Sequence, residues 1–204
     1  MSDRKLIALT FDDGPNTDTT PHFLDRLERY GVRATFFVEG QFITEKTIPV
    51  MKRAMSLGCL IENHAYTHTN MSDMGEEQIR KELLDTDGLV LLATGRVPKF
   101  FRPPYIGLSD TLFASVDKTF ICGFNAEDWD PSIETEERAK RILAQAKHGG
   151  IILLHDMSGN MKTAEALDTL IPALLEQGYS FVTVEELFRE MGTVAEKGQI
   201  YTYL

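Results

Sequence analysis

The sequence predicts an α/β fold, a distorted (β/α)7-8 barrel in a single domain, and three observations carry this prediction. Short apolar runs alternate with amphipathic stretches along nearly all of the 204 residues, a pattern typical of a parallel sheet covered by helices. No repeat of fixed period, linker or low-complexity tract divides the chain. Polar residues follow the ends of five predicted strands, and the carboxyl ends of barrel strands open onto one face.

A doubly wound open sheet is the alternative fold, but such a sheet usually places its site at one switch point. Polar residues at five strand ends therefore favour a closed or nearly closed barrel. We expect one domain over residues 1–204, with residues 193–204 as a C-terminal tail.

Each predicted strand is a short apolar run, and each predicted helix lies between residues that favour helix ends. Pro21 suits the first turn of the first helix, and Gly31 suits its end. The predicted strands are residues 6–10, 34–38, 59–62, 99–102, 119–124, 151–155 and 180–184, with 199–203 as an additional edge strand. The predicted helices are residues 20–30, 43–57, 76–93, 109–118, 134–146, 164–176 and 185–191.

Composition narrows the class of partner. The net charge of −10 argues against nucleic acid and anionic membranes, which require basic patches, and favours a neutral substrate such as a sugar polymer. Cys59 and Cys122 lie in apolar runs and are expected to be free thiols. The polar start contains no apolar signal segment, so we expect a cytoplasmic protein, or a secreted one if a signal has been removed.

The first strand leads into two adjacent carboxylates, Asp12 and Asp13, followed by Gly14 and Pro15. Neighbouring side chains on a strand point to opposite faces. Both carboxylates can therefore serve one site only if the chain bends between or just after them, and Gly14-Pro15 is expected to supply that bend. Two like charges disfavour each other's ionisation unless a cation lies nearby. The pair thus predicts a metal and an arginine close by, although alone it also fits an ordinary turn.

His64 and His68 are four residues apart in a predicted polar loop after the third strand. On a helix or helical turn, this spacing puts both imidazoles on one face. Two histidines and one carboxylate can hold a catalytic zinc with one position open for water. The same triad suits non-haem Fe(II), and two surface histidines in a loop are the simpler alternative.

Three other polar groups follow predicted strand ends. Arg102 stands before two prolines, which hold the chain extended, and could supply the cation that the aspartates require. Asp128 and Trp129 follow the fifth strand, where the indole either packs in the core or walls a pocket. His155 ends an apolar strand and is either a hydrogen-bonded rim residue or a general acid whose pKa a neighbouring carboxylate sets.

Five motifs in this order resemble those of the polysaccharide deacetylase family, also called the NodB-homology domain or carbohydrate esterase family 4. They are Thr10-Phe11-Asp12-Asp13-Gly14-Pro15, His64-x-x-x-His68, Arg102-Pro103-Pro104-Tyr105, Asp128-Trp129 and Leu153-x-His155. The resemblance spans residues 5–190 and implies a distorted barrel that hydrolyses acetyl groups on sugars. Glu62, Ile106 and Asn125 depart from the usual family residues, and these departures concern substrate choice more than chemistry.

The resemblance also implies a role for each residue. The metal ligands would be Asp13, His64 and His68, holding Zn²⁺ or, as alternatives, Co²⁺, Ni²⁺ or Fe²⁺. Asp12 would be the general base that takes a proton from water activated by the metal, and Arg102 would keep it ionised. His155 would be the general acid, and Asp128 would tune it. The substrate-binding residues would be Pro103, Tyr105 (through its backbone N–H, at the oxyanion), Trp129 and Leu153.

The expected activity is metal-dependent removal of acetyl groups from an N-acetylglucosamine-type polymer or oligosaccharide. Residues 99–187 are similar to the acetyl xylan esterase branch, so removal of O-acetyl groups from xylan is the alternative. A non-catalytic carbohydrate-binding barrel and an oxygen-dependent Fe(II) enzyme are more distant hypotheses. The expected partner is an acetylated saccharide, without nucleic acid or membrane insertion, and the chain is expected to be a monomer.

Overall fold

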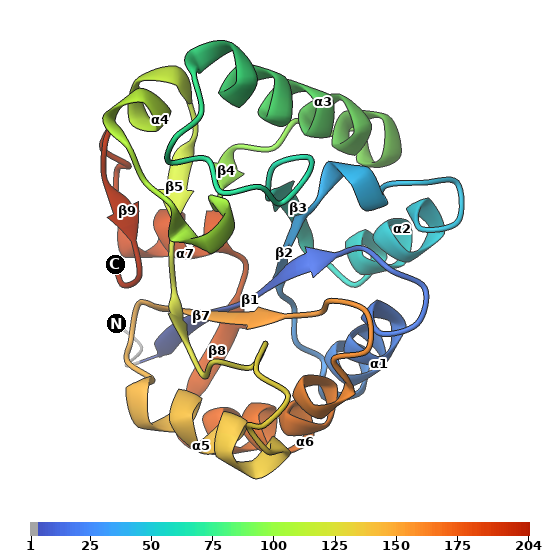
Figure 1. Cartoon of the computed structure of the whole chain (residues 1–204). Helices are drawn as coiled ribbons and strands as arrows, with labels where there is room; N and C mark the ends of the chain where they lie inside the picture. Colours follow the sequence, from blue (N-terminus) through green and yellow to red (C-terminus); the bar gives the residue numbers. More distant parts are fainter. Residues whose placement is uncertain (1–3) are drawn as a thin grey trace.

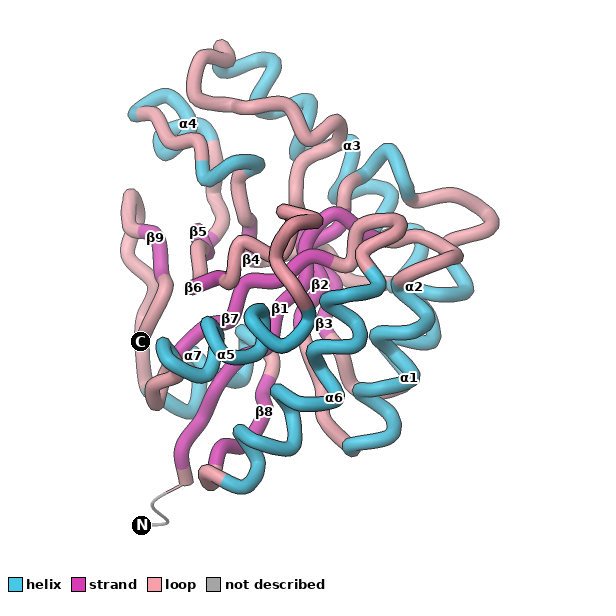
Figure 2. Tube along the Cα trace, turned by 60° about the horizontal axis from the view of Figure 1, so that its bottom comes forward, coloured by secondary structure: helices cyan, strands magenta, loops and turns pink. Residues whose placement is uncertain are grey.

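Parallel strands form the centre of the molecule and helices surround them (Figure 1, Figure 2). The structure is a computed structural model that describes residues 4–204, so the first three residues of the polar start lie outside it. The strands are β1 (Lys5–Gly14), β2 (Thr35–Val38), β3 (Leu60–Asn63), β4 (Phe100–Phe101), β5 (Thr119–Ile121), β6 (Phe124–Asn125), β7 (Gly150–His155), β8 (Tyr179–Val182) and β9 (Ile200–Tyr201). The helices are α1 (Thr20–Tyr30), α2 (Ile48–Ser56), α3 (Glu76–Thr94), α4 (Asp110–Ser115), α5 (Thr135–Gln145), α6 (Met161–Glu176) and α7 (Val184–Met191), with 3-10 turns η1 (Gly40–Phe42) and η2 (Pro104–Ile106).

The strand order explains how the sheet closes. It runs β6-β7-β1-β2-β3-β4-β5-β9, with β8 also paired to β1, and all of these strand pairs are parallel. Only Cys122 and Gly123 separate β5, which pairs with β4, from β6, which pairs with β7. Residues 119–125 therefore pair first with β4 and then with β7, and so connect the two ends of the curved sheet. The predicted α/β fold class is confirmed, and the predicted strand 119–124 is split where the barrel is distorted.

The break in this strand depends on Gly123. Its φ of +114° is disfavoured for other residues, and an added Cβ would lie 2.9 Å from Leu153 Cβ and 3.0 Å from the carbonyl oxygen of Ile151. We expect Gly123→Ala to lower the free energy of unfolding by about 1–3 kcal/mol, measured by urea denaturation. Gly159→Ala is the matched control, because Gly159 has a φ of +83° but an added Cβ there would meet nothing within 4 Å. Equal losses in both variants would contradict a packing role for Gly123.

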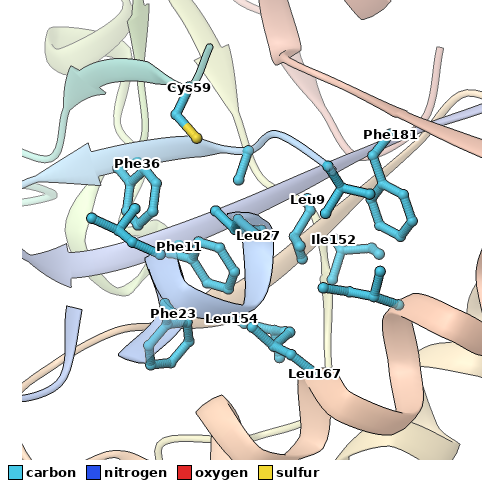
Figure 3. Packing of buried hydrophobic residues seen from close by; sticks show 14 of the residues in the cluster. Leu9, Phe11, Phe23, Leu27, Phe36, Cys59, Ile152, Leu154, Leu167 and Phe181 are labelled. Carbon is cyan, nitrogen blue, oxygen red and sulfur yellow. The ribbon is translucent and has the colours of Figure 1, made fainter. Parts of the chain in front are cut away.

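The core has two main layers because β1 is buried on both faces. The alternate residues Ile7, Leu9 and Phe11 point into the layer beneath α1 and α6 (Figure 3). There they pack with Phe23, Leu27, Ile152, Leu154 and Leu167. Leu6 and Ala8 point to the other face and pack inside the ring with Phe37, Phe100, Ile151 and Val182. Such continuous apolar character is typical of parallel strands covered on both sides. Burial on both faces therefore fixes the strand that carries the two aspartates.

Several element boundaries differ from the sequence prediction for local reasons. The helix expected from residue 43 begins at Ile48, because η1 occupies residues 40–42. α7 begins at Val184, directly after a capping box. The Thr183 hydroxyl accepts a hydrogen bond from the N–H of Glu186, and the Glu186 carboxylate accepts one from the N–H of Thr183. The predicted edge strand in the tail is confirmed as β9, which pairs with β5.

Two further expectations concern the whole chain. Cys59 is buried and Cys122 is partly exposed, and both thiols are free. Among residues 4–204, no helix combines the length and the apolar character needed to cross a lipid bilayer.

Candidate active site

Three side chains, one from the end of β1 and two from the loop after β3, converge at one end of the ring. The Oδ1 atom of Asp13 lies 3.2 Å from Nε2 of His64 and 3.3 Å from Nε2 of His68. These are the ligand atoms of a group whose members all lie within 4.8 Å of one another. Asp13 Oδ1 is buried and receives no hydrogen bond within the described part of the chain. Two imidazole nitrogens and an unsatisfied carboxylate oxygen form a donor set that suits a divalent cation.

Asp13 reaches this group through its own backbone conformation. β1 does not end at Thr10 as predicted but continues through both aspartates to Gly14. Asp13 has a φ of +71°, and the register between β1 and β2 shifts between Asp12 and Gly14. A left-handed residue at such an irregularity redirects its side chain. The bend expected at Gly14-Pro15 therefore lies one residue earlier, at Asp13 itself.

His64 and His68 lie in a loop, as the polar residues after the third predicted strand indicated, and not on the helical turn that their spacing also fits. Ala65 and His68 adopt φ values of +63° and +55°. Asn63 Oδ1 accepts a hydrogen bond of 2.7 Å from the N–H of Ala65, and Glu82 from α3 accepts hydrogen bonds of 2.8 Å from the next two N–H groups. A loop held by side chains, and not helical periodicity, brings the two imidazoles together.

A backbone hydrogen bond sets the orientation of His64. Its Nδ1 lies 2.6 Å from the carbonyl oxygen of Arg102, which can only accept. Nδ1 therefore carries the proton, and Nε2 presents its lone pair to Asp13. Burial opposes ionisation of Asp13, but the neighbouring imidazoles of His64, His155 and His68 lower the pKa of Asp13 to about 2.

Asp12 and Arg102 form a buried ion pair beside this group. Arg102 Nη1 lies 2.5 Å from Asp12 Oδ1, and the two residues are 0% and 2% exposed. The guanidinium carbon lies 4.2 Å from the centre of the Phe37 ring. Asp12 Oδ2 is 3.8 Å from Nε2 of His64. The cation that the paired aspartates required is thus Arg102, and it contacts the aspartate outside the three-ligand group.

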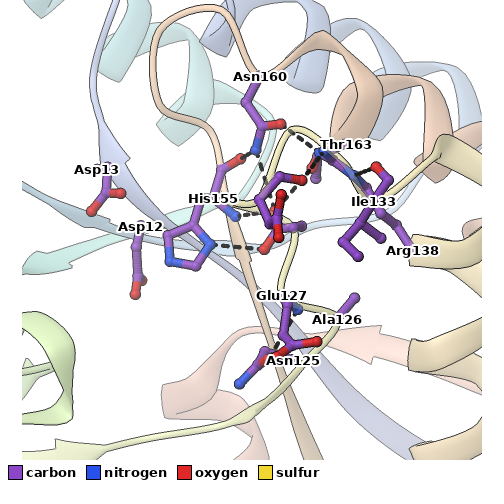
Figure 4. Close-up of polar contacts among 12 residues, drawn as sticks. Asp12, Asp13, Asn125, Ala126, Glu127, Ile133, Arg138, His155, Asn160 and Thr163 are labelled. Carbon is purple, nitrogen blue, oxygen red and sulfur yellow. Dashed lines mark hydrogen bonds and ion pairs between the residues drawn. The ribbon is translucent and has the colours of Figure 1, made fainter.

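His155 ends β7 directly beside Asp12, its register partner on β1. Its Nδ1 lies 2.8 Å from Oδ1 of the fully buried Asp128, and its backbone N–H donates to the other carboxylate oxygen at 2.9 Å. Figure 4 shows the imidazole between this hydrogen bond and Asp12. Burial opposes protonation of the ring, but the charges of Asp128, Asp12 and Asp13 raise the pKa of His155 to about 9.

Two exposed aromatic rings cover different histidines of the site. The Tyr105 ring lies 4.7 Å from that of His68 and the residue is 69% exposed, while Trp129 packs edge-on against His155 at 5.3 Å and is 46% exposed. Trp129 is therefore at the rim and not in the core. Tyr105 has a φ of +58°, and the hydrogen bonds that close η2 use the N–H groups of the two residues after it. Pro103 and Leu153 are buried beneath this surface.

Several residues that support the site were missed by the sequence analysis. They are Asn63, Glu82, Arg138, Asn160 and Thr163. Asn63 stands directly before His64, and Arg138 interrupts an apolar helix face that continues with Ala139 and Ile142. These signals were present, but polar residues at such positions are common and do not identify their partners.

A family model described as polysaccharide deacetylase matches residues 1–122. The chain belongs to the polysaccharide deacetylase family. The resemblance based on five motifs is therefore confirmed.

Other members of this family match nearly all of the chain, and two of them indicate the range of the family. The chain is 45% identical over 189 residues to a bifunctional xylanase/deacetylase of Pseudobutyrivibrio xylanivorans, covering 93% of this chain and 31% of that protein. It is 36% identical over 190 residues to the peptidoglycan-N-acetylglucosamine deacetylase PgdA of Listeria monocytogenes, covering 91% of this chain and 39% of that protein.

Solved structures of the polysaccharide deacetylase family include one with a metal ion. A family 4 acetyl xylan esterase from Clostridium thermocellum, in complex with a cobalt ion, superimposes with a TM-score of 0.95 at 42% identity, covering 98% of this chain and 99% of that chain. The chain thus has the extent of one esterase domain in that structure, but it spans only about a third of the length of the two longer relatives.

Proposed function

We propose that the chain is a metal-dependent hydrolase that removes acetyl groups from a saccharide, with O-acetylated xylan as its favoured substrate. The observation that carries this proposal is the grouping of Asp13, His64 and His68 beside two separate acid–base pairs, Asp12–Arg102 and His155–Asp128. The chain is 45% identical to a xylanase/deacetylase and 42% identical to an acetyl xylan esterase, which supports O-acetylated xylan as the substrate. Similarity of 36% to PgdA supports N-acetylated glycans as the second candidate.

The three-residue donor set fits Zn²⁺, which commonly binds two imidazoles and a carboxylate in catalytic sites. Co²⁺, Ni²⁺ and Fe²⁺ are the alternatives, and the cobalt complex of the esterase supports the first of these. Asp13, His64 and His68 would hold the ion through Oδ1 and the two Nε2 atoms. When bound, such an ion polarises the acetyl carbonyl and lowers the pKa of water to about 7.

The remaining residues divide the proton transfers between them. Asp12, paired with the adjacent Arg102 guanidinium, takes a proton from the attacking water. The backbone N–H of Tyr105 stabilises the negative charge that develops on the acetyl oxygen, and one such donor commonly contributes about 3–4 kcal/mol. His155, protonated near neutral pH, donates from Nε2 to the departing sugar oxygen or nitrogen. Trp129 and Leu153 line the position of the acetyl methyl group.

The deciding experiment is a panel of acetylated substrates scored for released acetate. Acetylated xylan, chitooligosaccharides and peptidoglycan are incubated with the zinc-loaded protein. We expect the highest rate on acetylated xylan, a lower rate on an N-acetylated glycan, and no acetate from Asp12→Ala with any of them. Saccharide binding without acetate release from any substrate would indicate the non-catalytic barrel, and oxygen uptake with a reducing cosubstrate would indicate the Fe(II) enzyme.

The His155–Asp128 pair predicts a pH dependence of activity. Burial opposes protonation, but Asp128, with smaller contributions from Asp12 and Asp13, raises the pKa of His155 from 6.5 to about 9. The ring therefore carries its proton at pH 7.5, and activity falls as the pH rises through about 9. The stability from the charged ring follows the same direction: it is complete below pH 6.5 and is lost as the pH rises through about 9.

Asp128→Asn removes the charge that sustains this protonation. Burial then dominates, so we expect the pKa of His155 to fall and the rate at pH 7.5 to drop about 100-fold or more. The measurement is a pH–rate profile of acetate release. Glu127→Gln, an adjacent exposed position, is the matched control and should keep the wild-type profile. An unchanged basic limb in Asp128→Asn would show that His155 is not the acid.

A further inference from the structure

Arg138 is a buried arginine on α5 that the proposed reaction does not use. The residue is 2% exposed, and in the part of the chain described here no carboxylate oxygen lies within 4.0 Å of its guanidinium. Instead, Nε donates to the carbonyl of Ile133 at 2.8 Å and Nη2 donates to the carbonyl of Asp130 at 3.1 Å. Both carbonyls belong to the loop that carries Asp128 and Trp129. A buried cation without a direct counter-ion is costly, so its position calls for an explanation.

The other end of the guanidinium contacts the segment that follows His155. Arg138 Nη1 donates to Asn160 Oδ1 and to Thr163 Oγ1, each at 2.6 Å (Figure 4). Thr163 Oγ1 lies 2.9 Å and Asn160 Nδ2 lies 3.3 Å from Oδ2 of Asp128. Asn160 Nδ2 also donates to the carbonyl of His155 at 2.8 Å. Arg138 and Asp128 are therefore connected through two side chains, each of which contacts both of them.

The chemistry of these groups imposes one direction on the hydrogen bonds. A guanidinium can only donate, so the Thr163 hydroxyl uses a lone pair for Arg138 and must direct its hydrogen elsewhere. Its remaining partner is Asp128 Oδ2. Asn160 is likewise oriented with its oxygen toward Arg138 and its amide hydrogens toward Asp128. Asp128 Oδ2 therefore acts only as an acceptor, for Thr163, Asn160 and the backbone N–H of His155. This favours Nδ1 of His155 as the donor to Oδ1 and leaves Nε2 toward Asp12.

We infer that Arg138 is a positioning residue that, through Thr163 and Asn160, holds Asp128 as a pure acceptor and so fixes which ring nitrogen of His155 faces the reaction. This inference rests on the proposed role of His155 as the acid. Arg138 does not touch the reacting atoms. It contributes a permanent charge and a rigid set of donors that a smaller or neutral side chain would not reproduce.

The charged groups around the His155–Asp128 pair come from several elements. Asp12 and Asp13 face His155 from β1, while Arg138 faces Asp128 from α5. Asp130 and Glu134, in the loop before α5, also act on Arg138 through their charges. Burial lowers the pKa of Arg138, yet its ordinary value is so high that the guanidinium stays charged. Removing a donor from Asp128 concentrates negative charge on the oxygens that face His155, which favours protonation of the ring.

The test uses nitrogen-15 NMR of the zinc-loaded full chain, which reports both the titration midpoint and the neutral tautomer of His155. The signal is assigned by its loss in His155→Gln. Thr163→Val removes the connecting hydroxyl but leaves the Arg138 contacts to the loop, and Thr163→Ser is the matched control. We expect the midpoint of His155 to rise by about half to one pH unit in Thr163→Val and to stay at the wild-type value in Thr163→Ser.

Arg138 itself is tested by separating charge from geometry. Arg138→Lys keeps the charge without the planar fork, and Arg138→Gln removes the charge. We expect a higher titration midpoint for His155 in Arg138→Gln than in Arg138→Lys. In both variants we expect the neutral ring to be a mixture of the Nδ1-protonated and Nε2-protonated tautomers. A wild-type tautomer protonated on Nε2, or equal midpoints in Thr163→Val and Thr163→Ser, would overturn the inference. These readouts need no substrate, so absence of acetate release would refute the proposed function and leave this result interpretable.

Discussion

Removing the divalent ion from the protein should abolish acetate release, and adding Zn²⁺ should restore it. The buried Asp13 oxygen between two imidazole nitrogens has no other described partner, so the site is suited to little else. Metal ions supply several kcal/mol of charge stabilisation in such reactions, which corresponds to roughly a thousandfold in rate. The measurement is acetate release after dialysis against a chelator, followed by titration with Zn²⁺, Co²⁺ and Ni²⁺.

Thermal denaturation provides an independent readout of the same site. A ligand at about 100 times its Kd stabilises the folded state by about 2.7 kcal/mol, so Zn²⁺ should raise the Tm of the metal-free protein. Asp13→Ala should show neither the rise in Tm nor recovery of activity. His22→Ala, at an exposed histidine, controls for unspecific metal binding and should behave like the wild type. Full activity in the metal-free protein would refute the proposed metal dependence.

Asp12→Asn should lower kcat by about 100- to 10,000-fold, the usual contribution of a general base, without loss of zinc binding. The variant should also be less stable, because Arg102 is fully buried and loses its only ion-pair partner among the described residues. Removing one member of a buried ion pair typically costs about 3–5 kcal/mol. Rates of acetate release, bound zinc and urea denaturation measure the three effects separately.

A double variant separates catalysis from stability. Asp12→Asn combined with Arg102→Met removes both charges of the pair, so much of the lost stability should return. Activity should remain as low as in Asp12→Asn, because the base is still missing. If the double variant regained activity with stability, Asp12 would be a structural residue and another group would accept the proton.

The sequence predicts less about the two histidines than about the two aspartates. The aspartates are adjacent, so the requirement that both serve one site forced a bend between or just after them, and the structure has a left-handed residue at Asp13. The spacing of His64 and His68 fits a helical turn as well as a loop, and the loop that holds them depends on Glu82, which is 18 positions beyond His64 in the sequence and lies on α3. Periodicity describes local geometry and cannot include a partner from another element.

The alternation of apolar runs and helices, with polar residues at the strand ends, by itself determined the fold class, and the resemblance of five motifs indicated the family. Strand faces, helix ends and the residues within each motif are local features, because they depend on neighbouring residues. Only the tertiary structure decided the closure of the ring at Gly123, the left-handed turn of Asp13 and the link from Arg138 to Asp128. Each of these depends on contacts between residues far apart in the chain, and folding alone determines which distant groups share a hydrogen bond or a buried volume.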